Sequence, residues 1–237
     1  MNNTTLQLKI KQRLNKLASN DYDNIECWQI VEAFNKAQVE WCRRNIHGLN
    51  VVQEGDEQST RRIDDLQILI NTQPLTVVDK LNYFEAPVPA NYFDYKRVSI
   101  KGKNDCCDER DFVVYLADNG NLDLLLRDKN KRPSFDWAET FCTLKDNKIQ
   151  IYTNNEFEIT SASLTYYRQP IKIQIEGCTD PYLSTAAAPV ISATEVPCEF
   201  KDDVVELFID ETVKIIAGDI ESFNQYQRAQ QAVENNN

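Results

Sequence analysis

The chain has 237 residues, of which 42% are apolar, a proportion sufficient for a buried core. Its formal net charge of −11, from 26 basic and 37 acidic residues, argues against a protein that binds nucleic acid by neutralising phosphates. No apolar run approaches the roughly 18 residues that a membrane span requires, and residues 1–16 are too polar for the core of a signal peptide, so we expect a soluble protein that is not exported.

Two amphipathic helices are predicted at the N-terminus. The first covers residues 5–18, and the second begins after a turn at residues 19–23 and ends near Ile46. Asp23 supplies an N-cap for the second helix and Glu26 completes a capping box. Because the connection is short, the two helices should pack antiparallel. The apolar positions are Leu6, Ile10, Leu14 and Leu17 in the first helix, and Cys27, Ile30, Val31, Phe34, Ala37 and Trp41 in the second.

The middle of the chain, residues 63–175, is predicted to be rich in antiparallel β-structure. Residues 63–70 fit a helix or a strand, and the segments that follow have strand length and β-branched or aromatic content. Hairpin turns are expected at Gly120 with Asn121, and at Asn154 with Asn155, because glycine and asparagine tolerate positive φ. The expected strands are residues 75–84, 95–100, 112–116, 122–126, 141–144, 148–153, 156–160 and 163–168.

The chain closes with an extended connection at residues 176–199, a long amphipathic helix at residues 200–230 and a flexible tail at residues 231–237. The polar face of the helix includes Asp203, Glu206, Asp210, Lys214 and Glu221, while Leu207 breaks the pattern. The apolar stripe consists of Val205, Phe208, Ile209, Ile216, Ile220, Phe223 and Tyr226.

This order of segments predicts a single α+β domain over residues 1–237. The helical pair of residues 1–47 should cover the stripe of the terminal helix and form a helical layer with it. We expect the stripe from Val205 to Ile220 to be core, and the end beyond Phe223 to contact a partner.

The seven cysteines predict free thiols in a reducing cytosol, because their number is odd and no C-x-x-C spacing occurs. Adjacent Cys106 and Cys107, in a charged turn at residues 101–111, are the one close pair, and we expect no metal site there. The cysteines are Cys27, Cys42, Cys106, Cys107, Cys142, Cys178 and Cys198.

Catalytic chemistry is not indicated. His47, the only histidine, lies at a predicted helix end before Gly48, where it is expected to interact with terminal carbonyls. Adjacent carboxylates, such as Asp64 and Asp65 or Asp202 and Asp203, diverge on a helix or a strand. The six glycines form no phosphate-binding loop. We therefore expect no catalytic residue, no cofactor and no metal, and a protein that is not an enzyme.

Three stretches resemble the neck, or head-to-tail connector, proteins of tailed bacteriophages, especially the portal adaptors and rings of short-tailed, crAss-like phages. Residues 86–95 (Ala-Pro-Val-Pro-Ala-Asn-Tyr-Phe-Asp-Tyr) are similar to the family's Leu-Pro-x-Asp-Tyr turn, with Asn91 where aspartate is usual. Residues 164–170 (Leu-Thr-Tyr-Tyr-Arg-Gln-Pro) are similar to a strand that ends in Tyr-x-Arg-x-Pro. Residues 200–221 are similar to the family's closing helix, and the likeness in segment order spans roughly residues 5 to 230.

The resemblance implies a structural virion protein of the neck, made in the host cytoplasm and assembled as a ring of twelve copies. Such a ring would contact the portal protein and neighbouring neck or tail proteins, with no membrane involved. DNA would pass through its channel without specific binding, and an acidic channel would repel DNA and let it slide.

Two groups of residues are candidates for partner contacts. One is Phe223, Tyr226 and Arg228 at the end of the terminal helix. The other is the basic run at residues 127–133, which fits a solvated hairpin tip or a phosphate contact. In a ring its cations Arg127, Lys129 and Lys131 would reach a neighbour.

Two other functions remain open from the sequence. One is a cytosolic protein-binding or regulatory module, which genomic neighbourhood would distinguish from a virion protein. The other is a hydrolase built on scattered carboxylates, which a metal-dependent hydrolysis screen would detect.

Overall fold

The computed structural model describes residues 1–15, 25–47, 64–104, 107–184 and 188–219, together with residues 227, 230, 231 and 233. Helices and a large sheet confirm the predicted α+β class. The chain divides into two compact units: unit 1 combines Met1–Ile68 with Pro170–Asn237, and unit 2 is Leu69–Gln169. The single domain expected from the sequence thus contains two compact units, and unit 1 is assembled from both ends of the chain.

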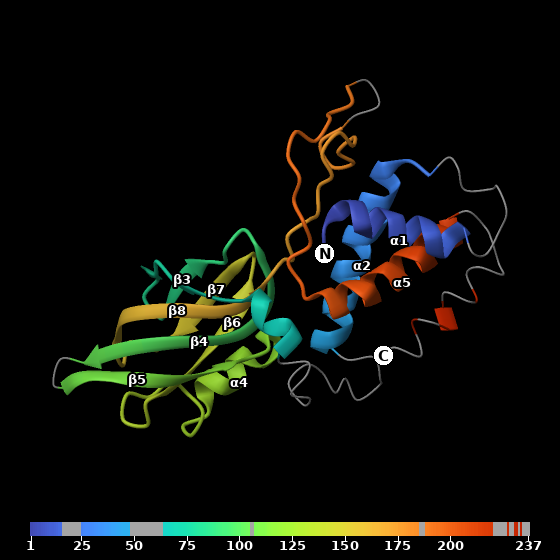
Figure 1. Cartoon of the computed structure of the whole chain (residues 1–237). Coiled ribbons are helices and arrows are strands. Elements are labelled where there is room, and N and C mark those ends of the chain that lie inside the picture. The colour runs from blue at the N-terminus through green and yellow to red at the C-terminus, as the bar shows by residue number, and fades with distance from the viewer. Residues whose placement is uncertain are drawn as a thin grey trace. The chain divides into compact units, whose positions relative to one another are not determined.

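The described part of unit 1 contains three long helices (Figure 1): α1 (Asn3–Asn15), α2 (Cys27–His47) and α5 (Asp202–Asp219). Helix α5 contacts both α1 and α2, as the stripe of the terminal helix predicts. The Phe208 ring is fully buried, and its centroid lies 5.8 Å from Phe34, 5.3 Å from Trp41 and 5.1 Å from Phe200. The described stripe positions are all buried: Val205, Phe208, Ile209 and Ile216.

The predicted polar face of α5 is also partly covered, because α1 packs along it. Glu206 forms ion pairs with Lys9 and Arg13, and Asp210 pairs with Arg13. Glu211 is buried and lies 3.3 Å from the Arg44 guanidinium. Helix α5 is therefore enclosed on two sides, which explains the burial of Val204, Thr212 and Val213 outside the stripe.

Residues 171–184 and 188–196 run out and back beside these helices, and we call them the flap. Isolated bridges join Gln174 to Val196 and Thr179 to Ile191. The sequence predicted only an extended connection here. The flap is instead fastened by side-chain amides. The Asn35 amide donates to the Ile173 carbonyl (3.3 Å) and accepts from its N–H (2.8 Å), and Asn3 donates to the carbonyls of Gln174 and Val196.

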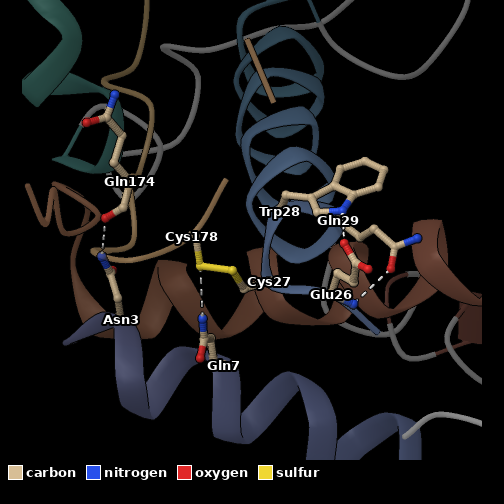
Figure 2. Close-up of a disulfide and its surroundings, with 8 residues drawn as sticks. All are labelled: Asn3, Gln7, Glu26, Cys27, Trp28, Gln29, Gln174 and Cys178. Carbon is tan, nitrogen blue, oxygen red and sulfur yellow. Dashed lines mark hydrogen bonds between the residues drawn. A yellow bond between two sulfur atoms is a disulfide. The ribbon is translucent and has the colours of Figure 1, made fainter. Parts of the chain in front are cut away.

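A disulfide between Cys27 and Cys178 corrects the prediction that all the thiols are free. Cys27 begins α2 and Cys178 belongs to the flap, so the bond ties the flap to the helical layer (Figure 2). The Cα atoms are 5.8 Å apart although the two cysteines have a sequence separation of 151. The Gln7 amide of α1 points at the Cys178 sulfur from 4.0 Å.

The remaining described cysteines should differ sharply in reactivity. Cys107 is exposed, whereas Cys42, Cys142 and Cys198 are buried free thiols. Burial raises the pKa of Cys42, and it raises the pKa of Cys142 and of Cys198 to about 11, so little thiolate forms at neutral pH. In native alkylation followed by peptide mapping, we expect Cys107 to be labelled and these three to be protected until denaturation. Cys27 and Cys178 should be labelled only after reduction, and their alkylation in the unreduced protein would contradict the disulfide.

Unit 2 is an eight-stranded sheet with the order β1-β8-β4-β5-β6-β7-β3-β2. Among the described strands, β5 and β6 pair in parallel and the other neighbours pair antiparallel. The sheet is thus mostly antiparallel, as predicted, and the parallel pair of β5 and β6 makes it mixed. The strands are β1 (Ile70–Pro74), β2 (Val78–Asp79), β3 (Tyr83–Pro87), β4 (Tyr92–Asn104), β5 (Cys107–Leu116), β6 (Glu139–Lys145), β7 (Lys148–Tyr152) and β8 (Glu158–Arg168).

The core of unit 2 lies on one face of this sheet. Leu164 of β8, Ile100 of β4 and Ile151 of β7 belong to one buried cluster. Leu75 and Phe84, from opposite ends of the strand order, also pack against this cluster, so the sheet curls around its own core. Asn154 and Asn155 both have positive φ and form a turn between β7 and β8, as predicted. The turn is not a hairpin, however, because β7 and β8 are not neighbours in the sheet.

Three local predictions need correction. Residues 122–126 were expected to be a strand and instead lie in the helix α4 (Leu122–Arg127). Gly120 and Asn121 belong to η3 (Asn119–Asn121), which leads into α4 and is not a hairpin turn. The two strands expected at residues 156–160 and 163–168 are one strand, β8. At residues 64–70 a helical turn and η2 (Gln67–Leu69) run directly into β1.

Candidate protein-interaction surfaces

The connection from β5 to β6 carries one group of the predicted partner-binding residues. Parallel pairing places Val113 beside Glu139, so residues 117–138 must cross back along the strands before β6 begins. The Asp118 carboxylate accepts from the Gly120 N–H (3.2 Å), and the Asn119 amide donates to the Leu144 carbonyl of β6 (2.8 Å). These contacts fasten the start of the crossover to the sheet.

The cations Arg127, Lys129 and Lys131 lie together where α4 ends, and all three are exposed. Their loop is shaped by Asp128, whose carboxylate accepts from the Asn130 N–H (2.9 Å) and whose carbonyl accepts from the N–H groups of Lys131 and Arg132. The sequence correctly predicted an exposed basic loop. The prediction of a hairpin tip was wrong, because the loop joins a helix to a strand.

Two large apolar side chains are exposed in the same crossover. Leu124 on α4 is 69% exposed, and Trp137, in the turn before β6, is 80% exposed. Phe135, two residues earlier, points inward and is buried, with the Arg110 guanidinium 4.9 Å from its ring centroid. We define the crossover surface as Leu124, Arg127, Lys129, Lys131 and Trp137. Tryptophan and arginine are the residue types most enriched among the energetically dominant residues of protein interfaces.

The flap of unit 1 carries a second exposed apolar group. Leu183 and Ile191 are 66% and 63% exposed, and Tyr182 is 45% exposed. Cys178 and Ser192 on the paired stretches are buried, whereas Ile191, next to Ser192, is exposed, as expected where neighbouring side chains of an extended chain alternate. We define the flap surface as Tyr182, Leu183, Ile191 and the exposed carboxylates Glu176 and Glu195.

The other predicted group, Phe223, Tyr226 and Arg228, lies outside the described residues. Where the described part of α5 ends, Ile215, Ile216 and Asp219 line a hollow of about 200 Å³ together with Trp28 and Lys36 of α2. Its lining combines apolar side chains with charges of both signs, such as Lys36 and Asp219.

The adjacent carboxylates noted in the sequence take part in ion pairs. Lys201 pairs with Asp64 and lies 4.0 Å from Asp65, and its hydrogen bond to Asp64 raises the pKa of Lys201. Glu109 lies 3.9 Å from Lys101 across the β4–β5 hairpin. Within the described ranges, no group of three histidine, cysteine or acidic side chains is arranged to hold a metal ion.

A polar hollow of about 550 Å³ lies at the end of the unit 2 sheet. Asp79, Leu81, Lys103 and Glu158 line it, and Glu156 at its wall pairs with Arg132 at 3.4 Å. Its lining carries charges of both signs, and no sequence motif had indicated it.

No known family model matches the chain, and no curated protein shows significant sequence similarity to it. Among the helices that the structure describes, none has the length and apolar character needed to cross a membrane.

Proposed function

We propose that the chain is a structural virion protein, a ring-forming subunit of the head-to-tail connector that bridges the portal and the tail components. The observation that carries the proposal is the crossover surface, where exposed Trp137 and Leu124 lie in the same short connection as three exposed cations. An exposed tryptophan of this kind is characteristic of a surface that another protein covers. The resemblance of segment order to connector proteins supplies the setting in the virion neck.

The charge of the chain is compatible with a channel for DNA. A ring of subunits with a net charge of −11 each presents a strongly negative field, which repels the phosphate backbone and favours sliding over retention. On this proposal the protein is made in the host cytoplasm, contacts the portal protein and neighbouring neck proteins, and takes no cofactor.

The proposal is tested by mixing the purified chain with the portal protein of the same phage. We expect mass photometry and electron microscopy to detect a ring of about twelve copies on the portal. A chain that stays monomeric in the presence of the portal, at concentrations well above those used for assembly, would refute it. A control portal from an unrelated phage should recruit no ring.

The crossover surface also suits a protein-binding module outside any virion. The two functions differ in the partner, so affinity capture from infected cells with the wild-type chain and with Trp137→Ser separates them. Loss of portal and tail proteins from the Trp137→Ser sample supports the connector. Loss of host proteins alone supports the module.

A further inference from the structure

We propose that copies of this chain associate head to tail, with the flap surface of one copy docked on the crossover surface of the next. This inference rests on the proposed ring and names the contact that would build it. The two surfaces belong to different units of the chain. The crossover surface carries basic side chains and the flap surface carries acidic ones.

Charge complementarity is the first argument for a second copy as the occupant. Residues 127–131 carry Arg127, Lys129 and Lys131 against the single carboxylate of Asp128, in a chain whose net charge is −11, whereas Arg132 is already paired with Glu156. Copies of such an acidic chain repel one another unless a basic segment lies at their contact. The flap surface supplies acidic partners, because Glu176 and Glu195 are exposed. Lys172 of the flap is engaged with the Tyr182 ring, with its ammonium 3.5 Å from the centroid.

Both surfaces also carry apolar residues on turns whose backbone is fixed by hydrogen bonds before any contact forms. The Asp180 carboxylate accepts from the N–H groups of Tyr182 (2.8 Å) and Leu183 (3.1 Å), which fixes the turn that exposes these two residues. On the crossover, the Ala138 N–H donates to the Phe135 carbonyl (3.1 Å) and closes the turn that exposes Trp137. A turn whose backbone is already fixed loses less conformational entropy on docking than a loose loop does.

Such a contact is compatible with a ring. A contact between two different surfaces leaves one of each unused at the ends of any short row of copies, so association continues. It ends in a closed ring when the rotation between neighbours suits closure, and in an open filament when it does not. Contacts of flap with flap, or of crossover with crossover, would instead stop at a dimer.

The inference is tested with two variants and their mixture. The crossover variant carries Arg127→Glu, Lys131→Glu and Trp137→Ser, and the flap variant carries Leu183→Ser and Ile191→Ser. All five side chains are exposed, so circular dichroism should show an unchanged fold. A matched control carries Leu8→Ser and Lys11→Glu, which are equally exposed residues of α1 outside both surfaces.

In sedimentation velocity without portal, we expect the wild type and the control to form oligomers as concentration rises. Each variant alone should associate at least about a hundredfold more weakly, since two or more dominant contacts are lost. The equimolar mixture should form a dimer and nothing larger, because only the intact flap of the crossover variant and the intact crossover of the flap variant remain.

Several results would overturn the inference. These are a wild type that remains monomeric at millimolar concentration, a variant that associates like the wild type, and either variant forming a dimer alone. Oligomers that dissolve on nuclease treatment would show that nucleic acid holds the copies together, and would overturn it too. Because the portal is absent, head-to-tail association can be found even if the connector function is refuted. Conversely, rings that both variants form on the portal as well as the wild type does would refute only this contact.

Discussion

Replacing Phe208 by alanine is expected to lower the free energy of unfolding of unit 1 by about 3 to 5 kcal/mol. The ring is fully buried in the middle of α5 and makes edge contacts with Phe34, Trp41 and Phe200. Its removal leaves a cavity between α2 and α5 that these large rings cannot collapse to fill.

The unfolding of unit 1 can be followed by tryptophan fluorescence, because the three tryptophans are divided between the two units. Trp28 and Trp41 lie in unit 1 and Trp137 in unit 2, so a Trp137→Phe background makes the fluorescence report on unit 1 alone during urea unfolding. Leu207→Ala is the matched control, because Leu207 lies beside Phe208 on α5 and is only half-buried. Leu207→Ala should lower the free energy of unfolding by less than half as much as Phe208→Ala does. Equal losses for the two variants would contradict the packing described for α5.

Loss of the Cys27–Cys178 bond, through Cys27→Ser together with Cys178→Ser, is expected to lower the free energy of unfolding of unit 1 by about 2 to 5 kcal/mol. The bond closes a loop with a sequence separation of 151 residues, and a long loop gains much freedom in the unfolded chain when the bond is absent. The same fluorescence measurement applies, with and without a reducing agent.

Reduction of the wild type should reproduce the loss seen in the double variant. Cys107→Ser is the control, since Cys107 is exposed and lies outside the Cys27–Cys178 bond, and the unfolding of this variant should respond to reduction as that of the wild type does. A double variant that unfolds with the wild-type midpoint, or a wild type that ignores reduction, would show that the bond does not stabilise unit 1.

The helices were predictable because their apolar residues repeat with the helical period. Leu6, Ile10 and Leu14 are fully buried, as their spacing predicts, and the stripe of α5 is core throughout its described length. Helix α4 was missed because Leu122–Leu126 is a short apolar run, and such a run fits a strand as well as a helix. Without α4 no crossover was visible, so the parallel pairing of β5 with β6 was missed as well.

Contacts between residues distant in the chain could not be predicted from the sequence. Neither the count nor the spacing of the cysteines indicates that Cys27 pairs with Cys178. The sequence predicted only an extended connection at the flap, because the flap is held by hydrogen bonds from single side-chain amides, such as that of Asn35 on α2. A side-chain amide that replaces a strand partner leaves no periodic signal in the sequence.

For the candidate surfaces, charge alone was informative. The basic run identified Arg127, Lys129 and Lys131 as exposed, since clustered like charges need solvent. Trp137 was missed, because Phe135 and Trp137 alternate in the sequence and only the packing decides that the first is buried and the second exposed. The alternating aromatic residues Phe135 and Trp137, after Pro133, were the feature of the sequence that could have indicated one exposed aromatic side chain.

The composition of unit 1 from both ends of the chain sets an order of events during synthesis. Unit 2 is a continuous stretch, so it can fold as soon as it leaves the ribosome, while α1 and α2 still lack their partner. Helix α5 is the last of the long helices to be made, and until it arrives the apolar faces of Leu6 and Phe34 stay uncovered. A chain that ends before α5 cannot bury these faces, and it therefore remains exposed to proteases and chaperones.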